Sequence, residues 1–399
     1  MKISGAKQYV FKRSFLIMLF LLALAPMSGA QEARPWSAWL FNPVEGSITE
    51  VRTNGEIIGA FRLPLAQAFN AYGDHILVSP GGRYIAFTAF DSTLADPNIQ
   101  LFVYDRQIGA TRFTYDLSGA IATGFELVPD QAAFDEQNGQ FAFGILTQTG
   151  WRLVIGDFTS NTVLAELTPD QVEQVVQLPG GSSVPAVRNY DGKTVFFTLM
   201  AYGTEVVTNY PAFRWDIGTR EIIPNTVYNS AYSDTLHGVG EVVIPASNDG
   251  WPAANHAEGS SVVLNTLDIA ASPNGPRFTV YNADDVSLIR AIFIENGMRV
   301  LAQTFNLQTD ESSLRVLDRD GVVVGELVGS LQGIRGTPDG FVGLFRASSG
   351  PALAHVNTRS NNYTLTTVWT GADVGVKLVH IQTEGQPPGN LPPWAQLSG

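Results

Sequence analysis

The sequence contains no cysteine. Disulfide bonds, thiolate catalysis, cysteine-ligated metal or iron–sulfur sites and lipid attachment at a cysteine are therefore all excluded. Charged residues are also scarce, at 15% of the chain against about 25% in an average soluble domain. Hydrophobic residues make up 45%, which is enough for a large core. Stability must therefore come from packing and hydrogen bonds.

Helical periodicity is nearly missing. One short stretch, residues 169–178 (PDQVEQVVQL), predicts a helical turn or two. Elsewhere apolar and polar residues alternate over short runs bounded by turn residues, as at 83–90 and 151–155, which is typical of β-strands. A chain of 399 residues then holds two or three domains or one large all-β domain.

The first thirty residues have the pattern of a secretory signal peptide. Four basic residues precede an uncharged apolar run from Phe15 to Ala25, and small residues end at Ala30. The alternative is an uncleaved membrane anchor, but this run is shorter than the roughly 20 residues that span a bilayer. We predict cleavage before Gln31 and a periplasmic or extracellular location.

The mature chain is strongly acidic. Removing the four basic residues of the signal from the 24 in the whole chain leaves 20 against 37 acidic residues, a net charge of −17. Such a surface repels phosphate backbones and anionic lipid headgroups. We therefore predict no nucleic-acid partner and no membrane insertion after signal cleavage. The charge favours a role in solubility over one in ligand steering.

Two series of turns recur along the chain. The first series places glycine after a polar residue and before a strand, at Gly82, Gly139, Gly192, Gly250, Gly297 and Gly340, with a mean spacing of about 52 residues. The second series separates two strands by a polar turn, at Thr53, Asp105, Asp157, Asp216, Asp268, Asp318 and Thr358, with a mean spacing of about 51. Both series therefore give the same period.

A period of this length with four strands predicts a β-propeller, and seven outer hairpins predict seven blades. A pair of β-sandwiches or a β-solenoid would not explain two alternating turn series. Blade 5 is the least regular, because residues 251–261 fit a second strand poorly. The start of the mature chain (36–63) supplies only three strands, so we predict that residues 373–381 complete blade 1 as its inner strand. The predicted parts are a signal peptide (1–30), one propeller (31–385) and a proline-rich tail (386–399).

One blade resembles a known repeat. Ser79–Phe87 (SPGGRYIAF), followed by Asn98–Asp105 (NIQLFVYD), is similar to the WD40-like (PD40) repeat of TolB-type propellers. Gly81 replaces the family's aspartate, whereas Thr337–Gly340 (TPDG) keeps it. The other blades match only in outline, and the six blades and extra α/β domain of TolB itself are not found. Similar propellers cap prolyl-oligopeptidase-type peptidases, whose hydrolase domain is also not found. The motif makes a turn, so it implies fold and not activity.

Catalytic and metal-binding motifs are weak. Residues 181–185 and 259–263 lack the last glycine of the Gly-x-Ser-x-Gly nucleophile turn. No dinucleotide or phosphate-binding glycine loop is complete. The five histidines (His75, His237, His256, His355 and His380) have no close pair. Asp318–Gly321 begins like a calcium loop, but Gly329 stands where the bidentate glutamate belongs, which favours a hairpin turn. A second polar cluster comprises Asp130, Asp135, Glu136 and Asn138. We predict no cofactor and no metal.

Long loops in blades 4 and 5 are the predicted binding site. Residues 199–211 and 224–240 are expected to lie on the face that carries the longer loops. The candidate ligand-binding residues are Tyr202, Tyr210, Tyr228, Tyr232 and His237, with Trp251 and His256 nearby. Tyrosine offers apolar area and a hydroxyl, which suits protein, peptide or sugar. Alternatively, these rings only pack the loops.

Two functions remain open from the sequence. The first is an exported, non-catalytic propeller that binds a protein, peptide or surface polymer. The alternative is a lyase, lactonase or glycoside hydrolase with an acidic funnel at the ring axis, for which the candidates are Glu205, Asp234, Asp310 and Glu311. A paired-carboxylate hydrolase needs acids about 5–10 Å apart, and a propeller fold favours neither function. The oligomeric state is open.

Overall fold

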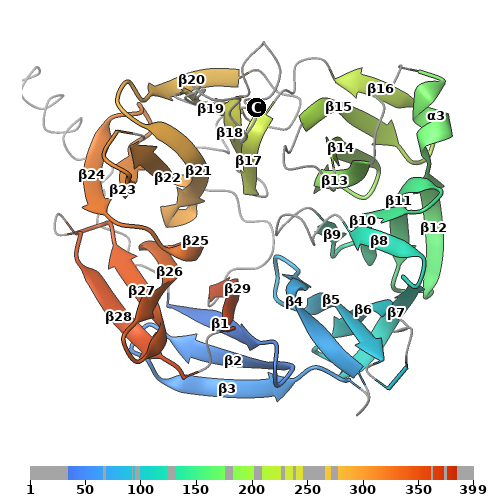
Figure 1. Ribbon diagram of the computed structural model, residues 1–399, viewed down its shortest axis with the longest axis horizontal. Helices are drawn as coiled ribbons and strands as arrows, with labels where there is room; N and C mark the ends of the chain where they lie inside the picture. The colour runs from blue at the N-terminus through green and yellow to red at the C-terminus, as the bar shows by residue number, and fades with distance from the viewer. Residues whose placement is uncertain are drawn as a thin grey trace, which may run out of the picture. The chain divides into compact units, whose positions relative to one another are not determined.

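A computed structural model gives the fold. It describes residues 35–65, 69–91, 93–94, 99–123, 132–175, 183–201, 209–225, 230–236, 240–245, 266–270, 277–306, 308–360, 363–372 and 375–383. The strands form seven antiparallel sheets that are arranged as the blades of a β-propeller (Figure 1). The predicted fold class and blade number are therefore confirmed. The predicted signal peptide and the tail lie outside these ranges. No helix within them is long and apolar enough to cross a membrane.

The first three blades, taken from inner to outer strand, include the two exceptions to a simple four-stranded order along the chain. Blade 1 contains β29 (Lys377–Thr383), β1 (Trp36–Asn42), β2 (Ser47–Arg52) and β3 (Ile57–Arg62). Blade 2 contains β4 (Phe69–Val78), β5 (Tyr84–Asp91), β6 (Ile99–Asp105) and β7 (Ala110–Asp116). Blade 3 contains β8 (Ala120–Thr123) and β9 (Ala133–Asp135), then β10 (Gln140–Thr147), β11 (Gly150–Asp157) and β12 (Thr162–Leu167).

The remaining four blades have the simple four-stranded order, again from inner to outer strand. Blade 4 contains β13 (Ser183–Tyr190), β14 (Thr194–Ala201), β15 (Asn209–Asp216) and β16 (Ile222–Asn225). Blade 5 contains β17 (Ser230–Leu236), β18 (Gly240–Pro245), β19 (Thr266–Ala270) and β20 (Arg277–Asn282). Blade 6 contains β21 (Ser287–Ile294), β22 (Arg299–Asn306), β23 (Glu311–Leu317) and β24 (Val323–Val328). Blade 7 contains β25 (Gln332–Thr337), β26 (Gly340–Ala347), β27 (Gly350–Asn357) and β28 (Leu365–Thr370).

This strand order defines two faces of the ring. The turn face carries the turns that join first to second and third to fourth strands. The loop face carries the connections between second and third strands and between blades. In blade 3, β8 and β9 pair with opposite ends of β10, so together they replace one inner strand. A short helix, α3 (Pro169–Glu173), follows β12, and Gln171 caps it by accepting a hydrogen bond from the Thr168 backbone. It confirms the predicted helical turn.

The C-terminal strand closes the ring as predicted. β29 pairs antiparallel with β1, in a register that sets His380 opposite Trp39 and Ile381 opposite Ala38. Blade 1 is thus built from both ends of the propeller (Figure 1). Leu378 is buried in a cluster with Trp36, Leu40 and residues of blade 7. Closure therefore joins blades 7 and 1 through a packed core and covers edges that would otherwise stay unpaired.

The first series of glycines occupies turns between first and second strands, with one correction. Gly82 and Gly139 have φ near +70°, where a residue with a Cβ is strained. In blade 5, however, the turn is not at Gly250: β17 ends at Leu236 and β18 begins at Gly240, whose φ is +139°. The second strand of blade 5 therefore precedes residues 251–261, which explains why that stretch fits a strand poorly.

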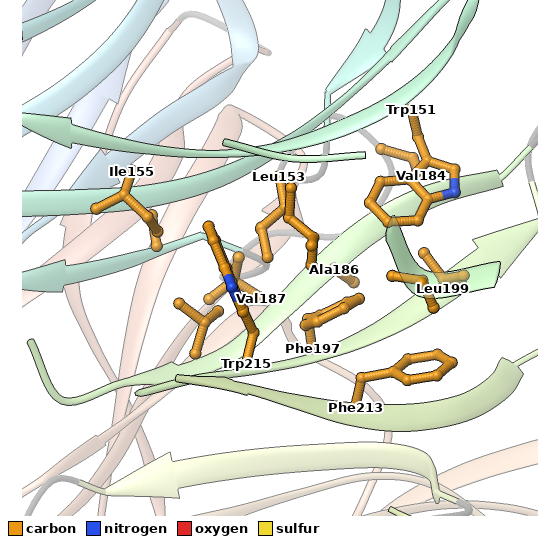
Figure 2. Close-up of a cluster of buried hydrophobic side chains, with 14 of the residues drawn as sticks. Trp151, Leu153, Ile155, Val184, Ala186, Val187, Phe197, Leu199, Phe213 and Trp215 are labelled. Atoms are coloured by element: carbon orange, nitrogen blue, oxygen red, sulfur yellow. The ribbon is translucent and has the colours of Figure 1, made fainter. Parts of the chain in front are cut away.

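Apolar clusters between neighbouring blades form the core. The cluster of blades 3 and 4 stacks Trp151 and Leu153 of β11 against Val184 of β13 and Phe197 of β14 (Figure 2). Similar clusters join blades 1 and 2, 2 and 3, 5 and 6, 6 and 7, and 7 and 1. Between blades 4 and 5, the residues that the structure describes form no such cluster. Among the described residues, the core is therefore distributed around the ring in clusters between neighbouring blades.

Candidate functional site

The structure locates only part of the predicted binding site. Tyr210 lies at the loop-face end of β15, and Tyr232 lies in the inner strand β17 opposite Ile244. The other five predicted ligand-binding residues lie outside the described ranges; they are Tyr202, Tyr228, His237, Trp251 and His256. Their role in binding therefore stays a prediction.

The prediction of one long loop at residues 224–240 is wrong. β16 continues to Asn225, and β17 occupies residues 230–236 and crosses the blade from the loop face to the turn face. The two ends of this range therefore lie at opposite faces and cannot form one loop. The alternation of small and polar residues in SAYSDTL concealed a strand, because few of its residues are apolar. The loop expected at 199–211 is shortened, since β14 reaches Ala201 and β15 begins at Asn209.

The acids proposed for an axial funnel are not seen to converge. Asp310 is exposed in the turn between β22 and β23, and Glu311 is the exposed first residue of β23. These are the second and third strands of blade 6 and not the inner one. Asp234 lies in the inner strand β17, and Glu205 is outside the described ranges. The described part of the chain therefore shows no pair of these acids facing one another across the axis.

Carboxylates on the turn face are occupied by turn hydrogen bonds. Asp318 accepts the backbone N–H groups of Asp320 and Val322 at 3.0 and 2.9 Å. This confirms a hairpin turn at the position that resembles a calcium loop. Asp135 accepts the backbone N–H groups of Gln137 and Asn138 in the same manner. Among the described residues, no three His, Asp or Glu side chains gather in a way that could hold a metal.

The turn face also ties neighbouring blades together. Glu136 of blade 3 accepts hydrogen bonds from the Ser79 hydroxyl and, at 2.9 Å, from the Gly81 N–H of blade 2. Ser79 in turn accepts the Tyr84 N–H at 3.0 Å. The Ser-Pro-Gly-Gly turn is thus a structural joint, as its resemblance to a repeat motif implies.

Asp339 is a buried charged joint on this face. Its Oδ1 accepts hydrogen bonds from Trp36 Nε1 at 2.7 Å and Thr337 Oγ1 at 2.8 Å, and His355 Nε2 lies 3.3 Å away. Burial would raise the pKa of Asp339, but His355, Thr337 and Trp36 outweigh it and lower the pKa. The group joins blade 7 to blade 1 and contains a carboxylate–histidine pair, but its hydroxyl, Thr337 Oγ1, donates to the carboxylate. We therefore assign it to ring closure.

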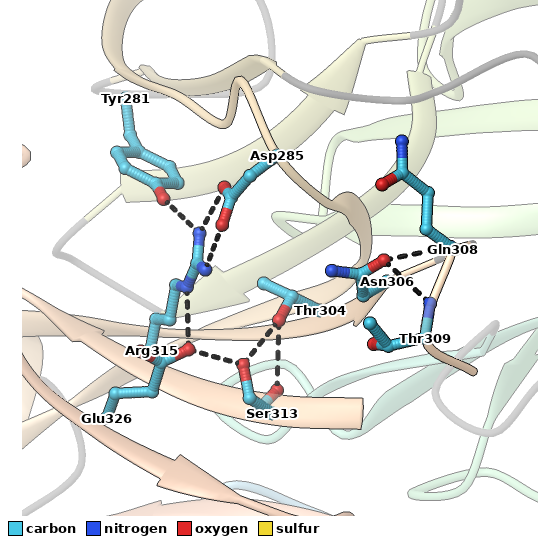
Figure 3. Close-up of polar contacts among 9 residues, drawn as sticks. All are labelled: Tyr281, Asp285, Thr304, Asn306, Gln308, Thr309, Ser313, Arg315 and Glu326. Carbon is cyan, nitrogen blue, oxygen red and sulfur yellow. Dashed lines mark hydrogen bonds and ion pairs between the residues drawn. The ribbon is translucent and has the colours of Figure 1, made fainter. Parts of the chain in front are cut away.

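A second charged joint lies between blades 5 and 6 (Figure 3). Arg315 of β23 makes two hydrogen bonds to Asp285, at 2.9 and 2.7 Å, and others to Tyr281 and Glu326. The hydrogen bonds from Arg315 lower the pKa of Asp285. A guanidinium held on three sides by its own chain is a structural anchor and leaves little capacity for a ligand.

The loop face instead presents apolar side chains to solvent. Five large exposed apolar residues lie on it, in the connections of several blades and at the loop-face ends of two inner strands: Val44, Leu94, Ile121, Val175 and Ile289. The turns of the turn face have three, namely Ile108, Met298 and Val322, and the outer strands of the blades have the other ten. Val44 is the most exposed of them all, at 85%. These loop-face residues form one candidate contact surface in the described part of the chain.

Sequence reasoning missed the basic residues of the inner strands of blades 6, 7 and 1. Arg290, Arg335 and Lys377 each stand alone in a strand without another charged residue, SLIRAIFI, QGIRGT and KLVHIQT. A single basic residue in a strand of alternating residues does not form a recognisable sequence motif. Aligning the blade repeats strand by strand would have found these basic residues, because the alignment shows that all three lie in inner strands of consecutive blades.

Comparisons with known proteins support the fold. No family model matches the chain, and no curated protein matches it. Among solved structures, the chain is similar to prolyl oligopeptidase B from Galerina marginata, with 9% identity, a TM-score of 0.52 and coverage of 85% of this chain and 51% of that one. It is also similar to one of two prolyl endopeptidases analysed for inter-domain dynamics, with 12% identity, a TM-score of 0.50 and coverage of 96% and 56%. The chain spans about half the length of these peptidases. At such identities the likeness shows a shared propeller fold.

Proposed function

We propose that this chain is an exported, non-catalytic binding protein that holds a protein, peptide or surface polymer on its loop face. The observation that carries the proposal is the set of exposed apolar residues on that face. Leaving large apolar groups in water costs about 25 cal/mol per Å², so a partner that covers them gains free energy. The turn face, by contrast, uses its polar groups to join blades.

The proposal includes a relationship to TolB-type WD40-like repeats. It is supported by the Ser79–Phe87 motif, whose serine and glycine make the joint with Glu136 on the turn face. It also includes tyrosine contacts from blades 4 and 5, which the sequence supports. No described pair of acids favours the alternative enzyme.

Site-specific photocrosslinking tests the choice of face. A benzoyl-phenylalanine placed at Val44 or Leu94 should give a discrete crosslinked product in the producing cell. The matched controls are Ile108 and Met298, which are exposed on the turn face. Equal products from both faces, or products from the turn face alone, would contradict the proposal.

A double substitution tests the predicted tyrosine contacts. Tyr228→Ala with Tyr232→Ala should weaken binding of the crosslinked partner while the melting temperature stays nearly unchanged. Side chains that only pack the blade would instead lose about 1 kcal/mol or more of stability. Loss of stability without a specific loss of binding would exclude these tyrosines.

A separate measurement tests the predicted export of the chain. Intact-mass analysis of protein recovered outside the cytoplasm should give a chain that begins near Gln31. A membrane-bound product that retains Met1 would contradict the signal-peptide prediction, and would leave the loop-face test unaffected.

A further inference from the structure

We propose a second site, for a small molecule with a carboxylate or phosphate group, on the inner strands of blades 6, 7 and 1. It goes beyond the loop-face partner proposed above. Its residues are Arg290 of β21, Arg335 of β25 and Lys377 of β29, with Ile289 beside them. Nothing in the composition of the chain would suggest an anion site, because acidic residues outnumber basic ones by 37 to 24.

The first support is the charge of these strands. β21, β25 and β29 are the inner strands of three consecutive blades, and they lie next to one another around the axis (Figure 1). Each carries one basic residue and none carries an acidic residue. The other inner strands hold Asp74, Asp135 and Asp234, besides Arg188. Basic charge is therefore concentrated on one side of the axis, in a chain whose overall field repels anions.

The second support is the height of these residues along the axis. Arg335 is paired with Val342, the third residue of β26, and Arg290 with Gln303, the fifth residue of β22. Lys377 is paired with Phe41, the sixth residue of β1. At about 3.3 Å per residue, the three backbones span roughly 10 Å from the turn-face side toward the loop face. The paired residues Val342 and Phe41 are buried in the clusters of blades 7–1 and 1–2, so Arg335 and Lys377 face different seams. The proposal has these long side chains reach past the inner edges of their strands to one oxyanion, which a guanidinium can hold through two hydrogen bonds.

The third support is that solvent reaches these strands. Ile289, Gln332, Gly333 and Lys377 are exposed although they belong to innermost strands. Arg290 and Arg335 are half-buried, and each of the three basic residues makes some further interaction within the chain. The proposal depends on where these charges lie and not on their being unpartnered.

An apolar feature suggests what the anion is attached to. A β-bulge in β21 sets Ile289 apart from the register of β22, and it is 47% exposed. Ile121, the extra residue of a bulge in β8 of blade 3, is 48% exposed. Strand β8 lies across the ring from β21 (Figure 1). Bulges commonly redirect one side chain. An apolar body between these two residues, with its oxyanion at the arginines, would cover both.

Calorimetric titration of the mature chain at low salt tests the site. The probes are sodium hexanoate, inorganic phosphate and the uncharged hexanol. We expect binding of hexanoate or phosphate, weakened about tenfold or more by Arg290→Gln or Arg335→Gln and by added salt. Arg346→Gln is the matched control, because it removes the same charge from an exposed position on β26 of blade 7. It should change the affinity less than about twofold.

The possible results of the titration are separable. Stronger binding of hexanoate assigns an apolar carboxylate, and stronger binding of phosphate assigns a phosphate group. Binding of neither probe, binding of hexanol as tight as that of hexanoate, or an equal loss in Arg346→Gln overturns the proposal. If an arginine variant does not fold by circular dichroism, Lys377→Gln replaces it, since Lys377 is exposed. These variants leave Val44 and Leu94 intact, so failure of this site and failure of the loop-face proposal are distinguishable.

Discussion

The two faces of this propeller are built from the same strands but use their residues differently. On the turn face, polar side chains bond to the chain itself, as when Glu136 joins blade 3 to blade 2 and Asp339 joins blade 7 to blade 1. On the loop face, Val44 and Leu94 extend into solvent. The joints at Glu136 and Asp339 thus lie on the opposite face from these apolar residues, although the Arg315–Asp285 joint uses a blade-to-blade connection of the loop face. Substitutions on the two faces should therefore differ in kind, one set affecting stability and the other binding.

The largest expected effect comes from removing the closing strand. A chain that stops at Thr370 lacks β29, so the apolar side of blade 1 and the edge of β1 become exposed. We expect aggregation or a strongly lowered melting temperature. A chain that stops at Gly385 retains β29 and should melt like the full mature chain. If the shorter chain stays monomeric and equally stable, the joint between blades 7 and 1 contributes little and the contrast between the faces fails.

A single residue gives the next largest effect. Asp339→Ala removes the acceptor of the Trp36 and Thr337 hydrogen bonds and leaves those buried donors unpaired. We expect a loss of about 3 kcal/mol in the free energy of unfolding by urea denaturation. Asp318→Ala, in an exposed turn of the same face, should cost about 1 kcal/mol or less. Equal losses would show that burial of the joint is unimportant.

The difference between the faces also explains what the sequence could predict. The turn face repeats because positive φ demands glycine and because aspartate accepts turn N–H groups. The glycine series that contains Gly82 and Gly139 and the series that contains Asp318 therefore have nearly the same mean spacing. Blade number and ring closure follow from that repeat. In blade 5 a different glycine, Gly240, makes the turn, and the prediction at Gly250 was wrong.

The candidate sites were less predictable for a physical reason. Residues that bind a partner are selected for contacts with that partner, so they need not recur at the spacing of the blade repeats. Arg290 and Arg335 are separated by 45 positions and become neighbours only through the stacking of blades 6 and 7. Exposure, which distinguishes Val44 from a buried valine such as Val51, depends equally on the fold.

The closing strand should also make the protein sensitive to acid. Burial, with help from Arg335 and Arg106, lowers the pKa of His380 to about 4, against an ordinary value of 6.5. Protons therefore bind preferentially to the unfolded chain between these values, so stability falls as the pH decreases from 6.5 to 4 and is unaffected by this group above 6.5. We expect a loss of about 2–3 kcal/mol over that window. His380→Phe should remove this part of the pH dependence in urea denaturation at about pH 4.5 and 7.5. An unchanged slope in His380→Phe would assign the acid sensitivity to other groups.

The smallest effect on stability, and the most direct contrast of the faces, comes from a matched pair of exposed residues. Val44→Ser on the loop face and Ile108→Ser on the turn face each remove an apolar side chain that is already largely in water. Val44 is 85% exposed and Ile108 is 54% exposed, so each substitution should change the free energy of unfolding by less than about 0.5 kcal/mol. Only Val44→Ser should weaken capture of the partner identified by crosslinking at Leu94, because only that residue shares the proposed surface. Equal weakening by both substitutions would mean that the partner covers the turn face as well, and the division between a structural and a binding face would be lost.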